Sequence, residues 1–200
     1  MKKWNELPKV MQNDKVKYYY DILQEHEKEL KLKRAFDIIC SLIMIIILSP
    51  VLIILSVMIK LDSKGPVLFK QVRVTTYGRK FKIWKFRTMV NNADKLGTQV
   101  TTKGDARITR MGHLLRKIRL DELPQLFNVL KGDMTFVGTR PEVPKYTAHY
   151  TEEMMATFLM PAGVTSRTSI EYKDEEKLLE NAENADEVYI NEVLPAKMVY

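Results

Sequence analysis

The feature that most constrains this chain is a run of 22 residues without a charged side chain, from Ile38 to Ile59. At about 1.5 Å per residue, a straight helix over this run is roughly 33 Å long, enough to cross the core of a bilayer. The run starts too late and is too long for a cleavable signal peptide. A buried helix of a soluble protein is the alternative, but the pattern favours a membrane segment.

Ser49-Pro50 lies in the middle of the run and argues against a straight span. Proline lacks a backbone N–H and clashes with the preceding turn, so we predict a kink or break here, with the Ser49 hydroxyl bonding a freed carbonyl. Basic residues prefer the cytoplasmic side, and they flank both ends of the run. We therefore predict a re-entrant, helix-break-helix segment over residues 31–62, whereas a spanning helix would carry one basic cluster across. The flanking residues are Lys31, Lys33 and Arg34 before the run and Lys60, Lys64 and Lys70 after it.

The membrane segment divides the chain into three parts. Residues 1–30 are polar and charged, and we interpret them as an accessory or interface extension without chemistry. Residues 63–200 mix apolar and polar residues as a folded domain does, and we interpret them as the catalytic domain. The sequence thus predicts an N-terminal extension, a membrane helix and one domain.

The domain itself shows two kinds of periodicity. Short strand-like runs over residues 67–69 and 72–74, a turn at Tyr77-Gly78 and an alternating pattern over residues 81–86 predict a short β-hairpin. Apolar residues at helical spacing predict helices over residues 109–120 and 123–130, and a charged amphipathic helix over residues 174–193. We predict an α+β fold: a small, mainly helical domain with a β-hairpin and interfacial amphipathic helices.

The charge balance indicates a phosphate-bearing partner. Thirty-two Lys and Arg against 25 Asp and Glu give a net charge of +7. A basic surplus attracts nucleic acid, nucleotides or anionic lipid headgroups, and composition alone does not choose among them. The single cysteine, Cys40, excludes an intrachain disulfide and fits a reducing compartment.

Asp121-Glu122 is the first candidate for chemistry. Pro124 favours a helix start, which would place Asp121 at or near an N-cap, and most such acids are only caps. The functional interpretation is that helix N–H groups and Arg116 gather phosphate beside a carboxylate nucleophile, as an aspartyl-phosphate intermediate requires. We expect capping interactions to keep Asp121 ionised at neutral pH. Glu122 could hold Mg²⁺.

Two further basic segments are weaker candidates. Arg140 stands between Thr139 and Pro141, and an arginine fork suits phosphate, although an Arg-Pro loop is usually only a loop. Residues 85–88 alternate basic and other side chains, which can bind nucleic acid but more often form one solvated and one buried face of a strand.

Taken in order, these blocks resemble the bacterial sugar transferases, also called monotopic phosphoglycosyl transferases or polyprenyl-phosphate sugar phosphotransferases. The resemblance covers residues 31–200 and departs from the family pattern at Thr139, where a Pro-Arg-Pro loop is usual, and at Ala106, where proline is common. The matching blocks are Lys33–Asp37, Ser49-Pro50, Gly65–Arg73, Lys85–Met89, Asp105–Gly112, Leu115–Lys117, Leu120–Met134 and Val137–Pro141.

The resemblance implies a ping-pong reaction with Asp121 as nucleophile. Asp121 would attack the sugar-bearing phosphate of a UDP-sugar and release UMP, and undecaprenyl phosphate would then take the phosphosugar. Glu122 would be catalytic and ligate Mg²⁺ as cofactor, and the product would begin a lipid-linked glycan for capsule, exopolysaccharide, O-antigen or glycoprotein. The implied substrate-binding residues are Arg116, Arg140, Pro141, Arg87 and Arg73.

The resemblance also implies a setting and partners. It places the catalytic domain on the cytoplasmic face of the bacterial inner membrane, in contact with lipid, with no nucleic acid, and as a homodimer or beside downstream glycosyltransferases. The competing interpretation is a non-enzymatic, membrane-anchored basic module that binds nucleic acid or anionic lipid. Such binding should weaken steeply with salt, whereas UMP release should demand Mg²⁺.

Overall fold

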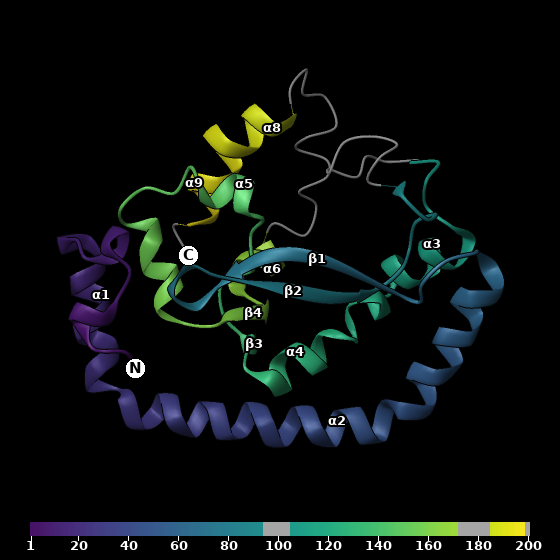
Figure 1. Ribbon diagram of the computed structural model, residues 1–200, viewed down its shortest axis with the longest axis horizontal. Coiled ribbons are helices and arrows are strands. Elements are labelled where there is room, and N and C mark those ends of the chain that lie inside the picture. The colour runs from purple at the N-terminus through teal and green to yellow at the C-terminus, as the bar shows by residue number, and fades with distance from the viewer. Residues whose placement is uncertain (94–104, 172–184, 199–200) are drawn as a thin grey trace.

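The computed structural model describes residues 1–93, 105–171 and 185–198. Figure 1 shows the long helix α2 (Glu27–Asp62) along one edge of the molecule, with the β-hairpin and the shorter helices on one side of it. This arrangement of one long apolar helix and a mixed, mainly helical domain confirms the α+β prediction at that level.

Helix α2 runs without interruption through Pro50. Figure 1 shows that it bends in its second half instead of breaking into two helices, so the predicted break is wrong and the predicted kink is right. In a helix, the N–H of residue 50 would bond the carbonyl of Ile46, and proline has no N–H to offer. Ser49 Oγ donates to that same carbonyl at 2.8 Å, which explains why the helix tolerates the proline.

The middle of α2 is apolar and uncovered. Ile46, Ile47 and Ile53 are each at least 64% exposed, and only 11% of the most apolar stretch is buried. Among the described residues, α2 is the one helix long and apolar enough to cross a membrane. Such exposure in water would be costly, so it disfavours the buried-helix alternative and fits a segment covered by lipid.

The first turns of α2 are bound to the domain by charged side chains. Arg34 donates to the carbonyls of Val129 at 2.6 Å and Leu130 at 2.8 Å, which end helix α4 (Gln125–Lys131). Asp37 is 3% exposed and accepts from Thr135 Oγ1 at 2.6 Å. These polar contacts fix the helix to the domain before it becomes apolar.

The last turns of α2 pack on the same domain. Leu55 and Ile59 form a buried cluster with Phe86 and Leu115. Asp62 accepts from the backbone N–H of Met111 at 3.2 Å, at the start of helix α3 (Arg110–Lys117). Both ends of α2 therefore contact one folded body, while Ile46 and Ile47 between them stay exposed.

The predicted hairpin is present. Strands β1 (Leu68–Thr75) and β2 (Arg79–Phe86) pair antiparallel across the turn η3 (Thr76–Gly78). Tyr77 and Gly78 take left-handed conformations, with φ of 58° and 72°. The hairpin is the platform on which the candidate site is built.

The helices that follow are shorter than predicted. Thr109 caps α3, which ends at Lys117 because Arg119 takes a left-handed conformation with φ of 59°. A single 3₁₀ turn, η5 (Leu120–Glu122), then leads into α4, and Gly132 ends α4. The sequence did not predict the parallel pairing of β3 (Met134–Val137) with β4 (Ala162–Thr165).

Both chain ends join one buried core. Met11 and Tyr20 from the N-terminal segment pack with Phe158 and with Tyr189 near the C-terminus. Residues 174–184 of the predicted C-terminal helix lie outside the described residues. The remaining elements are η1 (Trp4–Glu6), η2 (Lys9–Met11), α1 (Asp14–Glu25), α5 (Pro144–Thr147), η6 (Met154–Leu159), α6 (Arg167–Glu171), α8 (Ala185–Val188), the π-helical turn η7 (Tyr189–Val193) and α9 (Leu194–Lys197).

Candidate active site

One face of the hairpin carries the basic side of the site. The register pairs Phe69 with Lys85 and Gln71 with Ile83, so Gln71, Arg73 and Lys85 point to the same face. Arg73 donates through Nε and Nη2 to Gln71 Oε1 at 3.0 and 2.7 Å. The Gln71 side chain thereby orients the Arg73 guanidinium.

The two acids lie on the turn η5, between α3 and α4. Asp121 is 8% exposed, and Glu122 follows it on the same turn. Helix α4 begins only at Gln125, with Pro124 in the capping position and no side-chain cap. The prediction that Asp121 caps this helix is therefore wrong, and its burial has to be explained in another way.

Glu122 is held by two cations from distant parts of the chain. Its Oε1 accepts from Lys85 Nζ and from Arg140 Nη2, each at 2.8 Å. Burial alone would raise the pKa of this carboxyl, but Lys85 and Arg140 together lower it to about 2. Glu122 is therefore ionised throughout the physiological range.

Asp121 has the opposite electrostatic character. Burial raises the pKa of its carboxyl, the neighbouring Glu122 charge adds to the rise, and Lys85 and Arg116 oppose it. The expected capping contacts do not account for its charge state. A buried carboxylate with a raised pKa beside cations is a typical candidate for chemistry rather than for structure.

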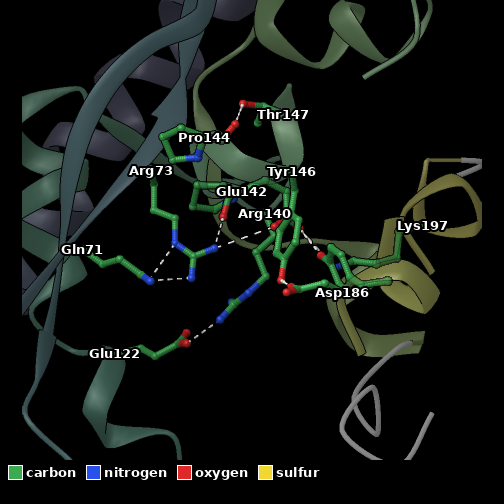
Figure 2. Close-up of polar contacts among 12 residues, drawn as sticks. Gln71, Arg73, Glu122, Arg140, Glu142, Pro144, Tyr146, Thr147, Asp186 and Lys197 are labelled. Carbon is green, nitrogen blue, oxygen red and sulfur yellow. Dashed lines mark hydrogen bonds and ion pairs between the residues drawn. The ribbon is translucent and has the colours of Figure 1, made fainter. Parts of the chain in front are cut away.

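Arg140 extends from a loop that lies against β1 and β4. The Thr139 carbonyl accepts from Gly163 N at 2.8 Å, so the backbone is fixed here despite the missing proline. Arg73 Nη1 donates to the Pro141 carbonyl at 3.0 Å. Figure 2 shows the guanidinium groups of Arg73 and Arg140 pointing into the same space, with Arg140 reaching Glu122.

Arg116 approaches the acids from α3. Its Nε donates to Thr88 Oγ1 at 2.9 Å. Burial raises the pKa of Asp121, and the positive charge of Arg116 opposes that rise. The structure therefore brings together Asp121, Glu122 and Arg116 with the loop at Arg140. Three cations from three elements, Lys85 of β2, Arg116 of α3 and Arg140 of the loop, act on two adjacent carboxylates, an arrangement suited to anionic phosphates.

Arg87 lies elsewhere. Its side chain is 5% exposed and donates to the carbonyls of Ser63 at 2.6 Å and Lys64 at 3.1 Å, at the end of α2. These contacts give Arg87 the role of tying the last turn of α2 to the domain. The structure does not bring it together with Asp121.

Lys85 is the residue that the sequence interpretation undervalued. Its local pattern predicts only a basic strand segment, yet Lys85 contacts Glu122, and burial lowers the pKa of its ammonium group. The signal that could have identified Lys85 is its position in the alternation of the strand. Lys85 lies on the same face as the buried Ile83 and Phe81, where a solvated lysine is not expected. Gln71 and Glu142 gave no comparable signal.

The family model described as bacterial sugar transferase matches residues 28–197. A UDP-N-acetylgalactosamine-undecaprenyl-phosphate N-acetylgalactosaminephosphotransferase of Aeromonas hydrophila is 46% identical over 123 residues, which are 62% of this chain and 29% of that protein. A UDP-glucose:undecaprenyl-phosphate glucose-1-phosphate transferase of Klebsiella pneumoniae is 40% identical over 157 residues, 76% of this chain and 33% of that protein.

A shorter relative matches over a larger share of its length. The uncharacterized sugar transferase EpsL of Bacillus subtilis (strain 168) is 37% identical over 139 residues, 70% of this chain and 68% of EpsL. The chain thus spans about a third of the two larger relatives and two thirds of EpsL. Because the family model covers most of the sequence, including every residue of the site, this chain belongs to the bacterial sugar transferase family.

Proposed function

We propose that the chain transfers a sugar 1-phosphate from a UDP-sugar to undecaprenyl phosphate and releases UMP. The observation that carries the proposal is the buried Asp121 carboxylate, with its raised pKa, beside a Glu122 fixed by Lys85 and Arg140. The names of the relatives, which act on UDP-sugars and undecaprenyl phosphate, support the same reaction. A basic module that only binds anions would not need buried acids among its cations.

The reaction balances over two steps. In the first, an Asp121 carboxylate oxygen attacks the phosphorus that bears the sugar, and the bond to the bridging oxygen breaks with its electron pair, releasing UMP. In the second, an oxygen of the lipid phosphate attacks the same phosphorus and frees the carboxylate. Arg116, Arg140 and Lys85 offset repulsion between Asp121 and the anionic substrate.

Glu122 is the proposed magnesium ligand. Lys85 and Arg140 both bond its Oε1, and among the described residues no hydrogen bond to Oε2 is found. Mg²⁺ needs only one or two carboxylates when phosphates and water complete its shell. Among the described residues, no group of three or more His, Cys, Asp or Glu side chains is placed to hold a metal ion. When bound, the ion would neutralise charge on the diphosphate.

We place α2 as a re-entrant helix on the cytoplasmic face of the bacterial inner membrane. Both ends of α2 contact one folded domain, through Arg34 at one end and Ile59 at the other, and its apolar middle is exposed. A spanning helix would require that domain to reach both sides of the bilayer. The product would start a lipid-linked glycan, and a homodimer or a complex with downstream glycosyltransferases stays a prediction.

Cysteine labelling in cells tests the topology. In a Cys40→Ala background, we expect Glu29→Cys and Lys64→Cys both to resist an impermeant maleimide added to intact spheroplasts, and both to react after permeabilisation. Both positions are exposed at the two ends of α2. Lys80→Cys on the hairpin serves as the reference for the domain side. Labelling of only one helix end from outside would contradict the re-entrant placement.

Arg140→Ala tests the phosphate contact. Losing a charge-assisted hydrogen bond costs about 1.5–3 kcal/mol, so we expect the KM for the UDP-sugar to rise roughly ten- to a hundredfold. Arg79→Ala is the matched control, since Arg79 forms an exposed ion pair with Asp133 at 2.8 Å and its loss should leave KM unchanged. Unchanged UDP-sugar kinetics in Arg140→Ala would show that the loop is only structural.

A further inference from the structure

Three consecutive residues of the loop bind three different parts of the molecule. Arg140 reaches Glu122, the Pro141 carbonyl accepts from Arg73, and Glu142 turns into the interior. The Glu142 carbonyl also accepts from Val74 N at 3.0 Å, which holds the loop against β1. The position of Arg140 therefore depends on what holds Glu142.

Glu142 is held by the C-terminal segment. Its Oε1 accepts from Tyr189 OH at 2.6 Å and from Lys197 Nζ at 3.2 Å, and Lys197 also donates to Tyr189 OH at 2.8 Å. Glu142 is 6% exposed and Lys197 is 9% exposed. Buried charges need such pairing, because removing one partner leaves the other uncompensated. We call Tyr189 and Lys197 on Glu142 the C-terminal clasp.

The Glu142 carboxylate competes with the active site for cations, and the clasp weakens this competition. Arg73 Nη1 already lies 3.8 Å from Glu142 Oε2, and Arg73 shares its space with Arg140. Without Lys197, a buried and negative Glu142 would attract these guanidinium groups more strongly. Lys197 therefore neutralises Glu142 and leaves Arg73 and Arg140 directed toward the space beside Glu122.

The segment that carries the clasp is docked independently of it. Tyr146 OH donates to Asp186 at 2.8 Å, and Lys145 forms an exposed ion pair with Asp186 at 2.5 Å. The rings of Tyr146 and Tyr189 lie 4.4 Å apart, and Figure 2 shows Asp186 and Lys197 on the same side of the Arg140 loop. A change confined to Lys197 should therefore leave the segment in place.

We propose that the C-terminal clasp is a positioning device for nucleotide binding: Lys197 neutralises Glu142 and Tyr189 hydrogen-bonds it, so that Arg73 and Arg140 bind the diphosphate of the nucleotide sugar. The inference rests on the proposed function, because it takes the diphosphate as the ligand of these arginines. Lys197 and Tyr189 act through Glu142 and do not contact the ligand.

The test is the affinity for UDP, measured by calorimetry with the full chain in detergent. Lys197→Met should raise the UDP dissociation constant and the UDP-sugar KM about tenfold, roughly the loss of one charge-assisted contact. The decisive variant combines Lys197→Met with Glu142→Gln, which also removes the negative charge of Glu142. It should return the UDP dissociation constant and the UDP-sugar KM to within about threefold of wild type. Tyr189→Phe removes only the hydroxyl that bonds Glu142 and should raise the UDP dissociation constant by a smaller factor. This milder variant keeps the test valid if Lys197→Met does not fold.

Lys145→Met is the matched control, because it breaks the exposed ion pair of the same segment without touching Glu142. It should bind UDP like the wild type. An unchanged dissociation constant in Lys197→Met, or a double variant as weak as the single one, overturns the clasp. A wild type that binds UDP yet releases no UMP contradicts the proposed function alone.

Discussion

Asp121→Asn is expected to abolish UMP release, on the order of a thousandfold or more, and to leave the protein folded. Asparagine keeps the size of the side chain but cannot form the acyl phosphate. In intact-protein mass spectrometry after incubation with a UDP-sugar and no lipid, the wild type should gain the mass of one phosphosugar on Asp121. The variant should gain none.

The stability of this variant separates a nucleophile from a structural acid. The pKa of Asp121 is raised in the folded state, so its ionised form is disfavoured there, and the charge costs stability as pH rises above the ordinary aspartate range. Asp121→Asn removes that cost and should unfold at the same or a higher temperature at neutral pH. The wild-type rate should fall as the pH is lowered, because Asp121 then becomes protonated and cannot attack phosphorus.

Asp133→Asn is the control for this experiment. Asp133 pairs with Arg79 near the end of α4, is partly exposed and lies outside the proposed machinery. Its variant should keep both UMP release and the adduct. An active Asp121→Asn enzyme, or an adduct that maps to another residue, would refute the nucleophile.

The parts of the fold that were predictable are those fixed by neighbours in sequence. Alternation in the strands, the Tyr77-Gly78 turn and the proline tolerated by Ser49 depend on contacts within a few residues. Helix lengths were less predictable. Arg119 ends α3 early because it takes a left-handed conformation, which no neighbouring residue in the sequence predicts. The β3–β4 pairing joins distant segments and has no periodic signature across the gap.

The site was predictable as a set of residues and not as a set of contacts. Asp121, Glu122, Arg116 and Arg140 do converge, but the partner that fixes Glu122 with Arg140 is Lys85, 37 residues away along the chain. Long-range pairs of this kind arise from packing rather than from local pattern. The same reason explains why Arg87 was placed at the substrate although it binds the end of α2, since a sequence shows a charge but not its direction.

Glu122→Gln is the second large expected effect, and it tests the metal. We expect turnover to fall on the order of a hundredfold, because the variant loses the carboxylate that would hold Mg²⁺ beside the diphosphate. Chelator should stop the wild type and added Mg²⁺ should restore it. Glu152→Gln, at an exposed acid away from the site, should behave like the wild type in both conditions.

The stability effect should be opposite in sign to that of Asp121→Asn. The pKa of Glu122 is lowered to about 2 in the folded state, so its ion pairs stabilise the fold fully above its ordinary pKa of 4.5 and are lost as pH falls toward 2. Glu122→Gln should therefore lower the free energy of unfolding at neutral pH by about 2 kcal/mol, and this difference should vanish in acid. If Asp121→Asn and Glu122→Gln change the free energy of unfolding in opposite directions, Glu122 is the acid fixed by cations and Asp121 is the acid kept reactive. Full activity in chelator, or a wild-type Mg²⁺ dependence in Glu122→Gln, would remove Glu122 as a ligand and leave it as the anchor for Lys85 and Arg140.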